Sequence, residues 1–348
     1  TRRSSDLVKF VDRTFNCRHD HAMAIWTYIH EHDNGITNFH FEVSADLLNE
    51  KEIALINRMR PGLIQLEIGV QSANEITIRE INRTMKIDVL STIVDKIKKG
   101  NNVHQHLDLI AGLPYEGYES FGKSFDRVYK MNPEQLQLGF LKVLKGSVMH
   151  DRAQEYGIVY QDRAPYEVLS TKWLTYAEVI RLKQIEEMVE VYYNSGQFCC
   201  TMAALEQEFA SPFCMYECLA AYYDEKNAFA VSHSRIGRYE ILYDFIVKTC
   251  KERSEQYMEM LTLDMYLRDN VKKRPEFLRE SGVSSDEAAA FYKKEEKERT
   301  YLKAYEGYDR RQMRKMTHLE RIDGKTVLFD YKNRDPLTGN AAIYYLSE

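Results

Sequence analysis

The fold is decided by two stretches of sequence, Gly62-Leu-Ile-Gln-Leu-Glu-Ile-Gly-Val-Gln-Ser72 and Val103-His-Gln-His-Leu-Asp-Leu-Ile-Ala111. In each, apolar residues alternate with polar or small ones, as in a strand whose two faces differ. A helical stretch follows each, at Asn74–Arg83 and Ser120–Lys130. Strands that alternate with helices predict right-handed β–α–β units and a parallel sheet.

The same alternation extends in both directions from these two strands. Further strands are predicted at Val8–Asp12, Asn38–Val43 and Gln135–Val143. Helices between the strands are predicted at His19–His32, Ala45–Arg58 and Asp88–Lys99. Residues 1–150 are therefore predicted to form an α/β domain, a partial parallel TIM-like (β/α) barrel that comprises strands two to six of a full barrel.

Polar residues recur along these strands at positions that face one side of the sheet. A sealed barrel interior favours branched apolar side chains. A row of polar groups on neighbouring strands therefore predicts an open interior that holds a polar ligand. The residues concerned are His40, Glu42, Glu67, Gly69, Gln71, His104, His106 and Asp108.

The pattern changes beyond residue 150. Residues 151–174 are predicted to be an irregular connection, and 175–348 a mostly helical C-terminal domain. The charge-rich run Lys293–Lys315 is predicted to be a solvated helix face. The chain ends in a predicted β-hairpin, with strands at Gly324–Tyr331 and Ala341–Leu346.

Composition restricts the class of protein. Among 348 residues the net charge is −5 and 44% of residues are hydrophobic, so nucleic acid is not an expected partner. The sequence has no apolar run long enough to span a membrane. The six cysteines are irregularly spaced, which indicates reduced thiols and a cytoplasmic protein. Cys214 and Cys218 share a predicted helix face, but a lone pair is weak evidence for a metal.

Three motifs at successive strand ends carry a family resemblance. They are Leu66-Glu-Ile-Gly-Val-Gln-Ser72, Ile81-Asn-Arg83 and Leu107-Asp-Leu-Ile-Ala-Gly-Leu-Pro114. Together they resemble the radical S-adenosylmethionine superfamily, in the branch of oxygen-independent coproporphyrinogen oxidases, methylthiotransferases and cobalamin-binding radical enzymes. Phe10–Asn16 and Ala164–Leu169 are similar to the cobalamin-binding members, which have a helical C-terminal extension.

The resemblance implies a role for each motif residue. Glu42 and Gln71 would face the adenosine and methionine portions of S-adenosylmethionine, and Arg83 would pair with the methionine carboxylate. Asp108 would bind the ribose hydroxyls or position the substrate, as the one predicted catalytic residue. Gly112 and Pro114 would form the turn through which the backbone approaches adenine.

The sequence departs from the family pattern in its cysteines. The superfamily's C-x-x-x-C-x-x-C loop, which holds a four-iron four-sulfur cluster, does not occur in these residues. We therefore expect a truncated piece of a radical S-adenosylmethionine oxidoreductase or transferase, inactive without its cluster loop. The expected parent acts on an unknown substrate, with cobalamin, bound by an N-terminal domain, as a further candidate cofactor.

Two other interpretations stay open at this point. His104 and His106 can present two imidazoles on one strand face, with Glu42 or Glu67 as a third ligand, in a metal-dependent TIM-barrel hydrolase or lyase. Alternatively, the barrel is degenerate and serves as a non-catalytic binding module.

Overall fold

The structure, a computed structural model, describes residues 6–346. The chain divides into two compact units. The first runs to Asn194 and also takes in Phe209–Ala220, and the second consists of Ser195–Glu208 and the chain from Ala221 onward. Each unit is described separately below. The domain ranges predicted from the sequence stay a prediction.

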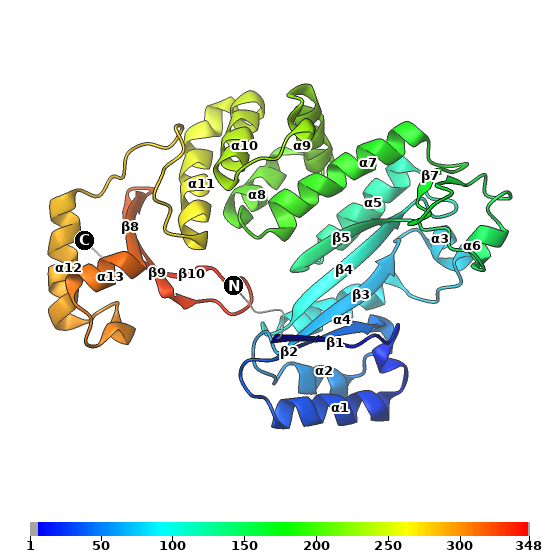
Figure 1. Cartoon of the computed structure of the whole chain (residues 1–348), viewed down its shortest axis with the longest axis horizontal. Coiled ribbons are helices and arrows are strands. Elements are labelled where there is room, and N and C mark those ends of the chain that lie inside the picture. The colour runs from blue at the N-terminus through cyan, green and yellow to red at the C-terminus, as the bar shows by residue number, and fades with distance from the viewer. Residues whose placement is uncertain (1–5, 347–348) are drawn as a thin grey trace. The chain divides into compact units, whose positions relative to one another are not determined.

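The first unit contains a five-stranded parallel sheet whose spatial order is the sequence order, β1-β2-β3-β4-β5 (Figure 1). A helix connects each strand to the next, which confirms the predicted partial α/β barrel. The strands are β1 (Leu7–Lys9), β2 (Asn38–Val43), β3 (Ile64–Gln71), β4 (His104–Ala111) and β5 (Gln135–Phe140). The helices between them are α1 (His19–Glu31), α2 (Glu50–Ile56), α3 (Glu75–Glu80), α4 (Ile87–Lys98) and α5 (Tyr118–Tyr129).

One face of the sheet is apolar and covered by helices. Phe41, Leu66 and Leu107 are fully buried on this face. Trp26 of α1 packs edge-on against Phe41, and Gln105 of β4 donates to the carbonyl oxygen of Val94 in α4 at 3.2 Å. Burying these side chains removes apolar area from water, and the helices hold the sheet from this side. The polar side chains of β2, β3 and β4 lie on the opposite face.

The stretch Ala45–Arg58, predicted to be one helix, is two shorter ones. A 3₁₀ turn covers Ala45–Leu47, and α2 begins after Asn49. The Asn49 side chain accepts from the backbone N–H groups of Lys51 and Glu52, and Glu52 bonds back to the Asn49 N–H. This capping box restarts the helix, because it satisfies N–H groups that a new first turn leaves without partners.

The chain after β5 packs against the end of the sheet. Lys142 forms a β-bridge with Glu167, and Val168 lies in an apolar cluster with Leu113, Val143 and Tyr156. The predicted connection 151–174 thus contains a short two-stranded ribbon that closes one end of the unit. Its elements and those that follow are α6 (Val148–Asp151), β6 (Val159–Tyr160), β7 (Val168–Ser170) and α7 (Tyr176–Val189).

The second unit is helical and ends in an antiparallel sheet, as predicted. The sheet has the order β10-β9-β8, so β8 (Thr317–Ile322) adds a third strand to the predicted hairpin of β9 (Lys325–Arg334) and β10 (Ala341–Tyr345). Asp323 and Gly324 join β8 to β9, both with positive φ. The helices are α8 (Cys199–Leu205), α10 (Arg235–Thr249), α11 (Ser254–Arg268), α12 (Ser285–Glu298) and α13 (Arg310–Met316), and α9 (Pro212–Glu225) belongs partly to each unit.

Candidate active site

The face of the parallel sheet opposite the packed helices carries polar side chains, which are in register from strand to strand. Glu42 of β2 is paired with Glu67 of β3, and Glu67 with His106 of β4. Two residues further along, Gly69 is paired with Asp108. Paired residues of parallel strands point to the same face, so these side chains form one polar surface. The prediction that they share a face is confirmed.

Gln71 closes the end of β3 with an irregular backbone. The pairing slips there, because Gly69 is paired with Asp108 whereas Gln71 is paired with Leu109. Gln71 has φ of +69°, a left-handed conformation that is costly for a residue with a side chain. The slip directs the Gln71 amide across to β4, where Nε2 donates to Oδ2 of Asp108 at 2.8 Å. Irregularities of this kind re-aim side chains next to active sites.

Asp108 has the most perturbed carboxyl group of this face. Burial raises its pKa to about 7, the negative charge of Glu67 acts in the same direction, and Arg83 and Gln71 oppose the shift. Its second oxygen, Oδ1, is buried and has no hydrogen-bond partner among residues 6–346. A buried acceptor without a partner is costly in a folded protein, so this atom calls for a ligand or water.

Arg83 is exposed and anchored by one side of its guanidinium. Nη1 donates to the carbonyl oxygen of Gly69 at 2.6 Å. A side chain at position 69 would collide with this arrangement, since a Cβ there would lie 2.9 Å from Nε2 of Gln71 and 3.3 Å from Nη2 of Arg83. A larger residue at position 69 would therefore displace the ends of the Gln71 and Arg83 side chains from this arrangement. The rest of the Arg83 fork is open to an anionic group.

The acidic pair Glu42 and Glu67 lies on the same face, two residues before the Gly69–Asp108 pair along the strands. Burial raises the pKa of Glu42, and the charge of Glu67 raises it further. Burial also acts to raise the pKa of Glu67, but hydrogen bonding to His40 and the charge of Lys9 outweigh it and leave the pKa below its ordinary value. His40 Nε2 lies 2.7 Å from Oε2 of Glu67. Hydrogen bonding and charge thus favour the ionised form of Glu67, whereas burial and the charge of Glu67 disfavour that of Glu42.

His106 supplies a second buried polar atom without a partner. Its Nε2 has no hydrogen-bond partner among residues 6–346, and the residue is 9% exposed. Burial lowers the pKa of His106, so the imidazole is neutral near pH 7. A neutral imidazole can donate or accept a hydrogen bond at this position.

Gly112 and Pro114, the other two predicted site residues, shape the loop after β4. Gly112 has φ of +89°, and a Cβ there would lie 2.7 Å from Cγ1 of Val168. The carbonyl oxygen of Pro114 accepts from Oγ1 of Thr77 at 2.9 Å. These contacts of both residues are with the protein itself, and their predicted approach to adenine stays a prediction.

A buried network that the sequence analysis missed fixes the loops after β3 and β4. Glu116 accepts from Oγ of Ser72 at 2.8 Å and from Oγ of Ser124 at 2.7 Å. The two hydroxyls in turn accept from the backbone N–H groups of Asn74 and Ala73. Burial raises the pKa of Glu116. No sequence pattern distinguishes Glu116 from an ordinary loop acid, because its partners come from two other segments.

The structure does not favour the predicted metal site at His104 and His106. Among the described residues, the group of three or more potential ligands whose donor atoms lie within 4.8 Å of one another is Cys199, Cys200 and Asp264, in the second unit. Cys214 and Cys218 do share one face of α9, where burial and the neighbouring Cys214 raise the pKa of Cys218 to about 11. They do not belong to such a group.

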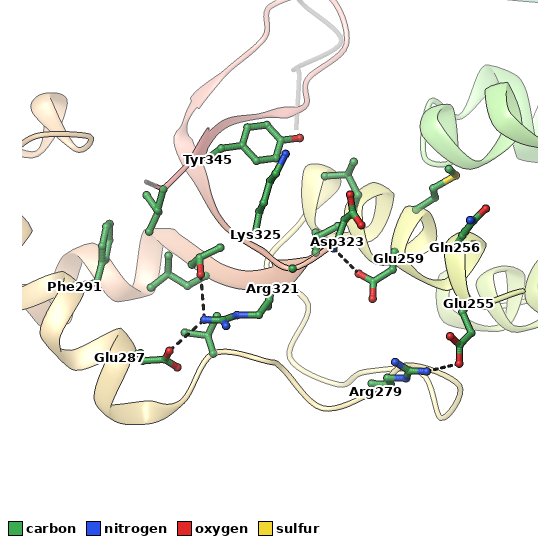
Figure 2. Close-up of a pocket in the computed structure, with 18 residues that line it drawn as sticks. Glu255, Gln256, Glu259, Arg279, Glu287, Phe291, Arg321, Asp323, Lys325 and Tyr345 are labelled. Carbon is green, nitrogen blue, oxygen red and sulfur yellow. Dashed lines mark hydrogen bonds and ion pairs between the residues drawn. The ribbon is translucent and has the colours of Figure 1, made fainter. Parts of the chain in front are cut away.

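A hollow of about 1400 Å³ lies within the second unit, between α11, α12 and the β8–β9 hairpin (Figure 2). Its charged side chains largely satisfy one another. Arg279 pairs with Glu255 at 2.6 Å and Arg321 with Glu287 at 3.2 Å, and the Asp323 N–H donates to Glu259. The unpartnered buried atoms of Asp108 and His106 lie instead on the parallel sheet, which makes that face the stronger candidate site.

Comparison with known proteins agrees with the half-barrel and its strand-end motifs. The chain is 29% identical over 107 residues to oxygen-independent coproporphyrinogen III oxidase of Salmonella typhimurium, which is 29% of this chain and 23% of the relative. The predicted resemblance to the radical S-adenosylmethionine superfamily is thereby confirmed, in the branch expected. The chain spans about a quarter of the length of the curated relatives it matches.

The solved structures to which part of this chain is similar include two radical S-adenosylmethionine enzymes. Coproporphyrinogen III oxidase (HemN) from Escherichia coli, described as a radical SAM enzyme, is 19% identical with a TM-score of 0.34, covering 38% of this chain and 31% of that one. TsrM from Kitasatospora setae, a radical S-adenosylmethionine methyltransferase with cobalamin and a [4Fe-4S] cluster bound, is 12% identical with a TM-score of 0.38, covering 45% and 30%.

The second half of the chain defines the family. Residues 154–336 match the model described as "Protein of unknown function (DUF4080)", and the chain belongs to this family. Among residues 6–346, no helix is long and apolar enough to cross a membrane.

Proposed function

We propose that the half-barrel of this chain binds S-adenosylmethionine as the catalytic domain of a radical S-adenosylmethionine enzyme. The observation that carries the proposal is the buried, unpartnered Oδ1 of Asp108, whose carboxyl group accepts from Gln71 at the carboxyl end of β3. Ligand sites of parallel α/β barrels lie at this end. The similarity to coproporphyrinogen oxidases supports the same interpretation.

The side chains of the site suit the groups of this ligand. S-adenosylmethionine carries ribose hydroxyls, an ammonium and a carboxylate. Oδ1 of Asp108 would accept from a hydroxyl or the ammonium, and the open part of the Arg83 fork would pair with the carboxylate. Gln71 holds the Asp108 carboxyl in place through Oδ2, and Oδ1 would then accept from the ligand. Glu42 would accept from a further hydroxyl or the ammonium.

An iron–sulfur cluster and S-adenosylmethionine, when bound, supply the reductive cleavage that starts radical chemistry. The cluster ligands would come from outside these 348 residues, since no three of the six cysteines have the C-x-x-x-C-x-x-C spacing. The chain alone is then inactive. Its role is to bind and orient S-adenosylmethionine and the substrate. The sequence names no substrate. A cobalamin-binding domain in the same parent protein stays a prediction, and so does a cytoplasmic location.

The first test is binding of S-adenosylmethionine to this chain by equilibrium dialysis. We expect weak binding, because this chain does not supply the cluster iron that would coordinate the amino and carboxylate groups of S-adenosylmethionine. Asp108→Asn and Arg83→Ala should each weaken it about tenfold, the effect of losing one hydrogen bond to a charged group. Arg79→Ala is the matched control, since Arg79 is an exposed arginine of α3 whose Nε donates to its own helix. Equal affinity in all four proteins would contradict the proposal.

The second test measures the chemistry. A longer polypeptide that joins this chain to a C-x-x-x-C-x-x-C segment, reconstituted with iron and sulfide without oxygen, should form 5′-deoxyadenosine when reduced. Asp108→Asn should reduce the rate in that protein. A reconstituted cluster that yields no 5′-deoxyadenosine would favour the non-catalytic binding module instead.

A further inference from the structure

The second unit contains a compact cluster of two thiols and a buried carboxylate, which the proposed function does not use. Cys199 and Cys200 open α8, and Asp264 lies in the middle of α11. We propose that these three side chains bind a thiophilic divalent metal ion, and that zinc is the ion they suit best.

The distances between the donor atoms match a tetrahedral zinc site. Zinc bonds of about 2.3 Å to sulfur and about 2.0 Å to oxygen place two sulfurs about 3.8 Å apart and a sulfur and an oxygen about 3.5 Å apart. In the structure, Sγ of Cys199 and Sγ of Cys200 are 4.0 Å apart, and Sγ of Cys199 lies 3.4 Å from Oδ1 of Asp264. All three donor atoms lie within 4.8 Å of one another. One ion can therefore contact all three with little movement.

The local fold holds the carboxylate toward the thiols. Oδ1 of Asp264 accepts from the Cys200 N–H at 2.9 Å, and Oδ2 accepts from the Thr201 N–H at 2.8 Å. The residue is 1% exposed, so these contacts fix its orientation. Metal-binding carboxylates are commonly oriented by hydrogen bonds of this kind. The carboxylate thus caps the start of α8 and lies beside the Cys199 thiol, which donates to Oδ1.

The donor set selects the class of ion. Thiolates are soft ligands that favour zinc over magnesium or calcium. Binding removes one proton from each thiol and releases both to the buffer, with no change of oxidation state. Three protein ligands leave a fourth position, and Cys199 is exposed, so water can fill it. The three side chains belong to the second unit, whereas the sheet face that would bind S-adenosylmethionine belongs to the first.

The experiment uses the whole chain, reduced and freed of metal with a chelator, and then titrated with Co²⁺ and Zn²⁺. We expect one equivalent of Co²⁺ to give the near-ultraviolet charge-transfer absorption of a thiolate-bound ion. One equivalent of Zn²⁺ should displace it and release about two protons. The double variant Cys199→Ser/Cys200→Ser should lose the band and bind at least about 100-fold more weakly, since both soft ligands are gone.

The matched control is Cys214→Ser/Cys218→Ser, which removes the other close pair of thiols and should titrate as the wild type does. Serine at 199 and 200 keeps the backbone N–H groups that bond Asp264, so circular dichroism should show an unchanged helix content. Asp264→Asn removes the third ligand and should weaken binding without abolishing the thiolate band. A wild-type chain without that band, or a band lost in the Cys214/Cys218 control instead, would overturn the proposal.

Discussion

Asp108 stands in a site that disfavours its ionised form, and this has a consequence for stability. Its pKa is about 7 in the folded chain, against an ordinary value of 3.8. The folded state therefore holds a proton that the unfolded state releases. The resulting stabilisation is greatest in acid and is lost progressively as the pH rises to about 7.

Asp108→Asn should remove this pH dependence. Between about pH 5.5 and about pH 8, we expect the wild type to lose about 2 kcal/mol of unfolding free energy that the variant does not lose. Asparagine can still accept from Gln71, so the fold is retained. Urea denaturation at the two pH values measures the difference, with the exposed Asp95→Asn as control. Parallel pH profiles of wild type and Asp108→Asn would refute an elevated pKa.

Single residues of the site differ in how far the sequence predicts them. Alternation along β4 was enough to place His106 and Asp108 on the polar face, because the side-chain period of a strand is fixed by its geometry. The left-handed backbone of Gln71 has no such signal, since glutamine does not favour positive φ. The unpartnered state of Oδ1 of Asp108 depends on neighbouring strands and cannot be derived from one segment.

At the scale of elements, the Glu116 network determines how the loops after β3 and β4 meet. Glu116→Ala would leave the hydroxyls of Ser72 and Ser124 without their buried acceptor, at a cost of about 3 kcal/mol. Glu116→Gln keeps an acceptor oxygen and should cost about 1 kcal/mol. Urea unfolding of both variants measures the difference. An equal loss in the two would contradict this expectation, because glutamine keeps the volume and one acceptor oxygen, and would assign the stabilisation to the carboxylate that both variants lack.

Two element boundaries differ from the prediction although the sequence carries a local signal for each. Asn49 and Glu52 have the spacing of the capping box that begins α2, within a stretch predicted as one helix. Asp323-Gly324, between the apolar alternations of β8 and β9, is a hairpin signal that the predicted C-terminal hairpin did not include. Both features carry a local signal in the sequence, because capping boxes and two-residue hairpin turns each depend on residues adjacent in the chain.

At the scale of the whole molecule, the first unit is completed by a segment distant in sequence. Phe213 and Tyr216 of α9 pack against Phe125 of α5, with ring centroids 5.6 and 5.8 Å apart. The Phe213 N–H donates to Asp126 at 2.8 Å. Nothing in the pattern of residues 209–220 pairs them with α5, because tertiary contacts of an apolar helix face leave no mark of their partner in the sequence.

This arrangement predicts how the chain responds when α9 is altered. Phe213 is 7% exposed and meets the face of α5 at Gly122, where a Cβ would lie 2.8 Å from its ring. Phe213→Ala should therefore cost about 3 kcal/mol in unfolding free energy, through lost burial and the cavity left behind.

A piece ending at residue 194 would expose Phe125 to water and should bind a hydrophobic dye, whereas a piece ending at residue 225 should not. Thermal unfolding of the variant and dye binding by the two pieces check this. If the shorter piece unfolds as cooperatively as the longer one, the half-barrel is complete without α9, and the contacts of Phe213 contribute little to holding the strand-end site.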